Sequence, residues 1–104
     1  MTGRDQLLAA LEAAAAELPD VRATATAESG SVWARGGMPF AFLVGASVEL
    51  RIGDTIAAAA LRTPDVMTSA RGSDWVVFAP LELDGHALDR LGAWFAAAHR
   101  RAVG

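Results

Sequence analysis

The sequence predicts an α+β fold. We expect a two-layer domain with a mostly antiparallel, four- to five-stranded meander sheet, N- and C-terminal helices packed on one face, and a short helix between the last strands. Three observations support this. Stretches with helical periodicity stand at both ends of the chain, short alternating stretches separated by turn residues lie between them, and a length of 104 residues is typical of one domain, here residues 1–104.

The first element is a helix that begins near the N-terminus. Its apolar residues recur at helical spacing and form one stripe: Leu7, Leu8, Leu11, Ala15 and Leu18. Thr2 and Asp5 have the spacing of a capping box, and Pro19 ends the helix. Acidic residues interrupt the apolar stretch, so we interpret it as a helix of the domain and not as a signal peptide.

Four strands are expected to follow. Residues 21–28 alternate small apolar and polar side chains, as a half-buried strand does. Residues 31–35 form a second strand, which the Gly36-Gly37 turn joins to a third at residues 39–45. Residues 47–53 alternate again and form the fourth strand.

The second half predicts a short helix, a last strand and a long helix. Asp54 is expected to cap the short helix, which ends at Leu61. Residues 63–73 form a loop with an extended piece at Val66–Met67, and residues 75–79 form the last strand. The final helix shows the stripe Leu88, Leu91, Phe95, Ala98 and Ala102, and Asp84 is expected to cap it.

Two of the predicted strands have apolar side chains on both faces. Residues 40–44 and 75–79 lack the polar alternation of 21–27 and 48–52. If the terminal helices cover one face of the sheet, apolar side chains remain on the other, and the short alanine-rich helix can cover only part of them. We therefore expect the second face to be buried against another chain, most simply a symmetric copy. The interface candidates are Leu43, Val76 and Phe78.

Composition argues against several classes of function. The formal charge is −3 and the nine basic residues are all Arg, which does not suit a protein that binds the nucleic-acid backbone. Without Cys, neither disulfides nor thiolate chemistry is available. No apolar run approaches the ~20 residues of a membrane span, so we expect a cytoplasmic protein without a membrane partner.

The chemistry-bearing residues suggest no catalytic, cofactor or metal site. His86 and His99 are the only histidines, and their spacing does not match a two-histidine metal pair. No serine lies in a G-x-S-x-G motif, and Asp54 and Asp84 are interpreted as helix caps. The tryptophans are interpreted as core or rim of the core: Trp33, Trp75 and Trp94. A sheet face with mixed charges is expected from Arg22, Arg35, Arg51, Glu28 and Glu49.

The chain resembles a group of small families in several of its segments. These are "LPDV" after the first helix, "PFAFLVGASVELRI", "DWVVFAP", and a last helix ending "AAAHRRAVG". Together they resemble the small luciferase-domain family and the MmcQ/YjbR-like and TfoX N-terminal-like domains, over residues 18–104. The resemblance implies a YjbR-like α+β domain without an established activity. DNA binding has been suggested for YjbR-like domains by fold analogy, and this chain lacks the basic residues for it.

The function expected from these observations is a non-catalytic binding or protein-interaction module, acting as a homodimer or as an accessory subunit of another protein. The alternative is a domain that holds a small apolar ligand between the sheet and the short helix. The third reading is an enzyme of unknown class or a YjbR-like nucleic-acid binder.

The net charge leads to a direct prediction about DNA. We expect no meaningful affinity for duplex DNA at physiological salt, because the chain is acidic and has no basic stripe. A gel-shift titration checks this, and a salt-sensitive shift at micromolar protein would contradict it.

Overall fold

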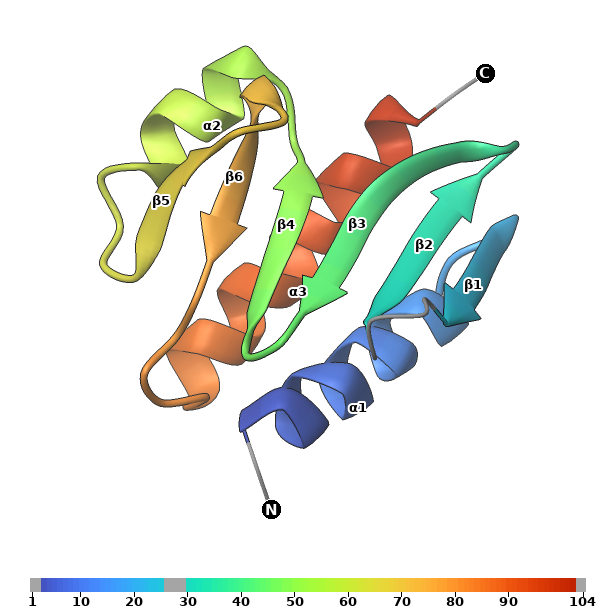
Figure 1. The fold of residues 1–104 in the computed structure, drawn as a ribbon, viewed down its shortest axis with the longest axis horizontal. Helices are drawn as coiled ribbons and strands as arrows, with labels where there is room; N and C mark the ends of the chain where they lie inside the picture. The colour runs from blue at the N-terminus through green and yellow to red at the C-terminus, as the bar shows by residue number, and fades with distance from the viewer. Residues whose placement is uncertain (1–2, 26–29, 103–104) are drawn as a thin grey trace.

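The computed structural model describes residues 3–25 and 30–102 (Figure 1). Its elements are α1 (Gly3–Ala16), β1 (Val21–Ala25), β2 (Ser31–Arg35), β3 (Met38–Val44), β4 (Ser47–Arg51), α2 (Asp54–Ala60), β5 (Val66–Ser69), β6 (Gly72–Phe78) and α3 (Gly85–Arg101). Parts of three expected features lie outside the described residues: the Thr2 cap, the end of the first strand at 26–28, and the turn at Ser29.

The sheet has six strands in the order β1-β2-β3-β4-β6-β5, and every neighbouring pair is antiparallel. The predicted two-layer α+β class is therefore confirmed. The meander is found only in β1–β4, because β6 and not β5 pairs with β4. The strand beyond the expected four to five is β5, which includes the extended piece expected at Val66–Met67 within the predicted loop. It forms a hairpin with β6, which begins at Gly72 and not at Trp75, and β5 becomes one edge of the sheet.

Helices α1 and α3 pack against one face of the sheet, as the sequence predicts. Helix α3 runs behind β3 and β4 in Figure 1, and α1 contacts both α3 and β4. Helix α2 packs against β6, and its Ala57 and Ala60 join the same core. The largest fully buried side chains of this core come from both layers: Leu11, Trp33, Phe40, Leu43, Val48, Leu50, Ile52, Val76, Phe78, Leu91 and Phe95. Within the described chain, no helix covers the other face of the sheet.

A bulge in the β2–β3 pair changes the alternation expected for the third strand. Trp33 pairs with Ala41 and Ala34 pairs with Pro39, so Phe40 is the extra residue. Its side chain is fully buried and meets the ring of Phe95 at 5.2 Å between centroids. In a regular strand Phe40 would lie on the same face as Phe42, but the bulge turns Phe40 toward α3.

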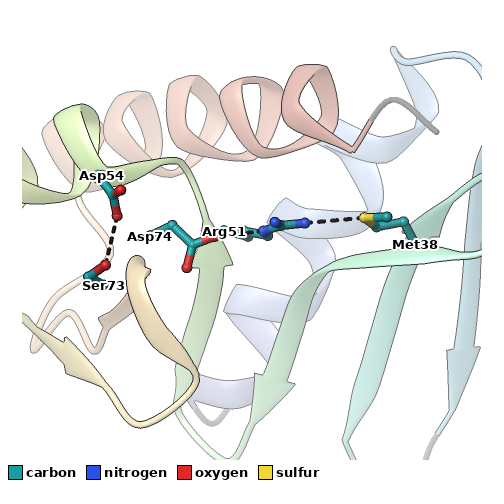
Figure 2. A network of polar contacts seen from close by, with 5 residues as sticks. All are labelled: Met38, Arg51, Asp54, Ser73 and Asp74. Carbon is teal, nitrogen blue, oxygen red and sulfur yellow. Dashed lines mark hydrogen bonds and ion pairs between the residues drawn. The ribbon is translucent and has the colours of Figure 1, made fainter.

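The two predicted helix caps have different outcomes. Asp84 occupies the N-cap of α3, and its Oδ1 accepts a hydrogen bond from the Ala87 amide at 2.9 Å, as expected. Asp54 is not a cap, because Gly53 holds the N-cap position of α2 with φ 91° and Asp54 is the first helical residue. Asp54 Oδ1 instead accepts a hydrogen bond from Ser73 Oγ at 2.8 Å (Figure 2).

Two expectations about burial also need correction. Leu88 was expected in the buried stripe of the last helix, but it is 44% exposed, and Ala87 is buried instead. In β1 only Val21 is partly buried, because this strand forms the sheet edge farthest from the centre of the core. None of the helices in the described ranges is both long enough and apolar enough to cross a membrane.

His99 links α3 to the segment that follows α1. It is buried, and its Nε2 lies 2.7 Å from the carbonyl oxygen of Pro19. Its own carbonyl oxygen accepts a hydrogen bond from Arg35 Nη1 at 3.0 Å. These contacts agree with a structural role for His99. His86, by contrast, is exposed at the start of α3.

The Asp84 cap gives a prediction about stability. Asp84→Ala should lower the free energy of unfolding by about 1 kcal/mol, because the Ala87 amide loses its side-chain acceptor. Asp89→Ala, at an exposed position within α3, is the matched control and should change stability by less than about 0.5 kcal/mol. Urea denaturation measures both, and an unchanged midpoint and slope for Asp84→Ala would contradict the cap.

Candidate functional site

The three interface candidates from the sequence lie on the wrong face for that role. Leu43, Val76 and Phe78 are 1%, 0% and 0% exposed. The strand register explains this, because Leu43 and Phe78 both pair with Val48, and Val76 pairs with Leu50. All of these side chains point to the core under α3. The second face of the sheet is therefore formed by the residues that alternate with these along each strand.

The helix-free face has a row of side chains that runs across five strands. The register places Val32, Phe42, Glu49, Val77 and Met67 side by side, in that order. Four of the five are apolar, and Met67 at the edge is 55% exposed. Val44, two residues after Phe42 on the same face, is 53% exposed. The face is thus apolar along its centre with one carboxylate in the middle.

A groove lies beside this row, toward the β2–β3 turn. It has a volume of about 640 Å³ and opens widely to solvent. Its lining includes Met38, Pro39, Phe42, Arg51, Arg71, Asp74 and Trp75. The groove therefore combines aromatic, aliphatic and charged groups, and we take it with the adjacent row as the candidate functional site.

Two aromatic rings and an arginine form one side of the groove. The rings of Phe42 and Trp75 are 5.6 Å apart between centroids, with an angle of 44° between their planes. The guanidinium carbon of Arg71 lies 3.6 Å from the centroid of Phe42 and 5.5 Å from that of Trp75. A guanidinium at these distances is attracted by the ring faces, so it is held over Phe42.

Glu49 holds the same arginine from the sheet. Its Oε2 lies 3.3 Å from Arg71 Nε, and its Oε1 accepts a hydrogen bond from Ser69 Oγ at 2.7 Å. Ser69 Oγ in turn accepts a hydrogen bond from the Arg71 amide. The turn between β5 and β6 is thereby tied to the centre of the helix-free face.

Arg51 forms the second charged wall of the groove. Its Nε donates to Asp74 Oδ2 at 2.8 Å, and its Nη1 lies 3.1 Å from the thioether sulfur of Met38 (Figure 2). The backbone carbonyl of Asp74 accepts hydrogen bonds from the amides of Ile52 and Gly53. The Asp74 backbone is thus fixed where β4 ends, and its carboxylate is directed to Arg51.

The arrangement suits binding better than proton transfer. The hydrogen bond from Arg51 holds the pKa of Asp74 below its ordinary value, against a smaller opposing effect of burial. An acid with a lowered pKa stays ionised near neutral pH and is a poor proton donor. In residues 3–25 and 30–102, no group of three or more His, Asp or Glu side chains is placed to hold a metal ion.

The other expected residues are dispersed over the fold. Trp33 is buried in the core, and Trp94 meets Phe78 at 5.2 Å under the sheet, whereas Trp75 lines the groove. Of the expected mixed-charge face, Arg51 and Glu49 lie at the site, Arg35 binds the His99 carbonyl, and Arg22 lies on the edge strand β1. Glu28 lies outside the described residues.

Sequence reasoning missed Met38, Arg71 and Asp74. The third and last strands are apolar on both faces. This could have identified Phe42 and Trp75 if the face covered by the helices had been known. Arg71 carried no such signal, because it lies in a turn of a hairpin that was expected to be a loop.

Comparisons with known proteins do not identify a family. No protein-family model matches the chain, and neither the curated proteins nor the solved structures gave a significant match. The resemblance to the luciferase-domain and YjbR-like families therefore stays a prediction.

The Arg51–Asp74 pair makes stability depend on pH in a defined direction. Because the folded-state pKa of Asp74 is lowered from 3.8, its contribution is present above that value and is lost as the pH falls through the folded-state pKa. The free-energy gap between wild type and Asp74→Asn should therefore be largest near neutral pH, at less than about 1 kcal/mol for this partly exposed pair.

This gap is measured by urea denaturation at a series of pH values. In an Arg51→Gln background, which removes the main cause of the lowered pKa, the effect of Asp74→Asn should lose most of its pH dependence. An unchanged pH dependence in that background would show that Arg51 is not the cause.

Proposed function

We propose that this protein is a non-catalytic protein-interaction module that pairs with a second copy through the helix-free face of its sheet. The observation that supports this most directly is the row of apolar side chains from Val32 to Met67, which the three helices leave outside the core. Exposed apolar groups that gather on one face favour association.

The charges on this face favour a second copy as the partner. A two-fold interface is self-complementary, so each positive group must find a negative group on the same surface of the other copy. Glu49 lies in the middle of the row, and Arg51 and Arg71 lie beside it. A two-fold axis that passes between Glu49 and Arg71 would place the Glu49 carboxylate of each copy close to Arg71 of the other copy.

The size of the face limits the strength of this association. Six strands about 4.8 Å apart, each near five residues long, give a face of roughly 400 Å² in projection. Standard interfaces bury about 800 Å² per partner. We therefore propose a reversible dimer with a small interface.

A second candidate function is the binding of a small apolar ligand. A hollow of about 330 Å³ lies between α2 and the β5–β6 hairpin, with Ala58, Leu61 and Thr68 in its wall. This is the position between the sheet and the short helix that the sequence suggested. Native mass spectrometry of the purified protein tests this candidate, because a retained ligand adds its own mass to that of the chain.

The location and the family also remain proposals. We propose a cytoplasmic location, which suits a sequence that has no cysteine for disulfides. A relationship to YjbR-like domains is supported by the order of the elements in the chain.

Charged substitutions on the helix-free face test the dimer. Val44→Asp and Met67→Asp introduce a carboxylate at positions that are already exposed, so the monomer should keep its fold. In the dimer each new charge would be buried without a partner, and the dissociation constant should rise at least about tenfold. Analytical ultracentrifugation measures this change, and circular dichroism checks the helices.

Leu88→Asp is the matched control for these substitutions. Leu88 is 44% exposed on α3, away from the helix-free face, so the same chemical change there should leave association intact. A wild type that stays monomeric at high concentration, with no ligand bound, would refute the proposed dimer.

A further inference from the structure

We infer that the groove bounded by Arg51, Arg71 and Trp75 is a binding site for a small organic carboxylate with a flat apolar body, such as an aryl carboxylate. This inference concerns a ligand and not the second copy, and it does not depend on the proposed dimer. Four features of the groove support it: its charge, the state of each arginine, its apolar wall and its size.

The charged groups of the groove suit a monoanion better than a dianion. Arg51 and Arg71 line the groove, and each already contacts one carboxylate, Asp74 for Arg51 and Glu49 for Arg71. A monoanion between the arginines would meet two guanidinium groups and add one negative charge. A phosphate dianion would add two negative charges beside Asp74 and Glu49 and is disfavoured for that reason.

Arg51 has a donor that is poorly used. Its Nε is bound to Asp74, whereas its Nη1 donates to the sulfur of Met38 at 3.1 Å. A thioether sulfur is a weak acceptor, and a carboxylate oxygen forms a stronger, charge-assisted hydrogen bond with a guanidinium. A ligand oxygen that replaces the sulfur would therefore gain a hydrogen bond without breaking the ion pair with Asp74 (Figure 2).

Arg71 is held in place before any ligand arrives. Glu49 contacts its Nε at 3.3 Å, and its guanidinium stacks on Phe42 at 3.6 Å. The contact with Glu49 uses Nε and leaves the terminal nitrogens as donors for a ligand. Because the side chain is already ordered by a carboxylate and a ring, binding costs less conformational entropy than it would with a free arginine.

The remaining wall of the groove is apolar and suits a flat group. Trp75, Met38 and Pro39 line it, and the indole offers a face on which a ring can stack. The volume of about 640 Å³ is within the range of small-molecule sites. A carboxylate between the arginines and a ring against Trp75 would use both halves of the groove.

The test uses 2-naphthoate as the probe and nuclear magnetic resonance as the readout. In ¹H–¹⁵N spectra, the indole N–H signal of Trp75, assigned with a Trp75→Phe variant, should shift in a saturable way. The indole signals of Trp33 and Trp94 are internal controls, because one lies in the core and the other packs on Phe78 under the sheet. The neutral analogue 2-naphthamide should bind about tenfold more weakly, because it lacks the charge-assisted hydrogen bonds.

Arg51→Gln and Arg71→Gln should each weaken naphthoate binding about tenfold. Arg22→Gln removes the same charge from the edge strand β1, so binding should remain at the wild-type level. Well-dispersed spectra establish that each variant is folded, and two independent arginine variants keep the test decisive if one of them unfolds.

Three results would overturn the inference: no saturable shift of Trp75 at millimolar naphthoate, equal binding of the acid and the amide, or wild-type binding by both arginine variants. Repeating the titration with Val44→Asp separates this test from that of the dimer. If naphthoate binds to Val44→Asp and the wild type forms no dimer, only the proposed interface is refuted. If the wild type forms a dimer and naphthoate does not bind to Val44→Asp, only the carboxylate site is refuted.

Discussion

The packing of all three helices against one face of a single sheet is the constraint on which the rest of this structure depends. Side chains of a strand alternate between faces, so the helices select one set of residues from every strand as core. Leu43, Val48 and Phe78 are adjacent in the register and belong to that set. The residues between them, including Phe42 and Val77, are left on the other face. The apolar character of the helix-free face thus follows from where the helices pack.

The charged groups on the helix-free face organise it more than they stabilise it. Partly exposed ion pairs contribute little to the free energy of folding. What they do here is hold two long side chains in defined positions, Arg71 over Phe42 and Arg51 against Asp74. A surface in which flexible cations are already ordered is suited to recognition, because less entropy is lost when a partner binds.

The sequence predicted most of the helices and strands, but it did not predict which face of each strand is buried. Helical stripes, turn glycines and alternation predicted the layers and the positions of most elements. They could not determine the parity of strands that are apolar on both sides, and for that reason Val76 and Phe78 were expected at an interface and lie in the core. The bulge at Phe40 depends on pairing with β2, which a single strand does not encode. Arg71 became visible as a site residue only when the hairpin placed it over Phe42.

The contact between His99 and Pro19 joins residues that are 80 positions apart, and α1 packs against α3 in the same region. During synthesis the first helix emerges long before the last, so Leu7 and Leu11 have no α3 to pack against until residues 85–101 have left the ribosome. Contacts between distant parts of a chain slow folding, since a long loop must close first. The β2–β3–β4 meander can pair before α3 has been made, whereas the closure of the core requires α3.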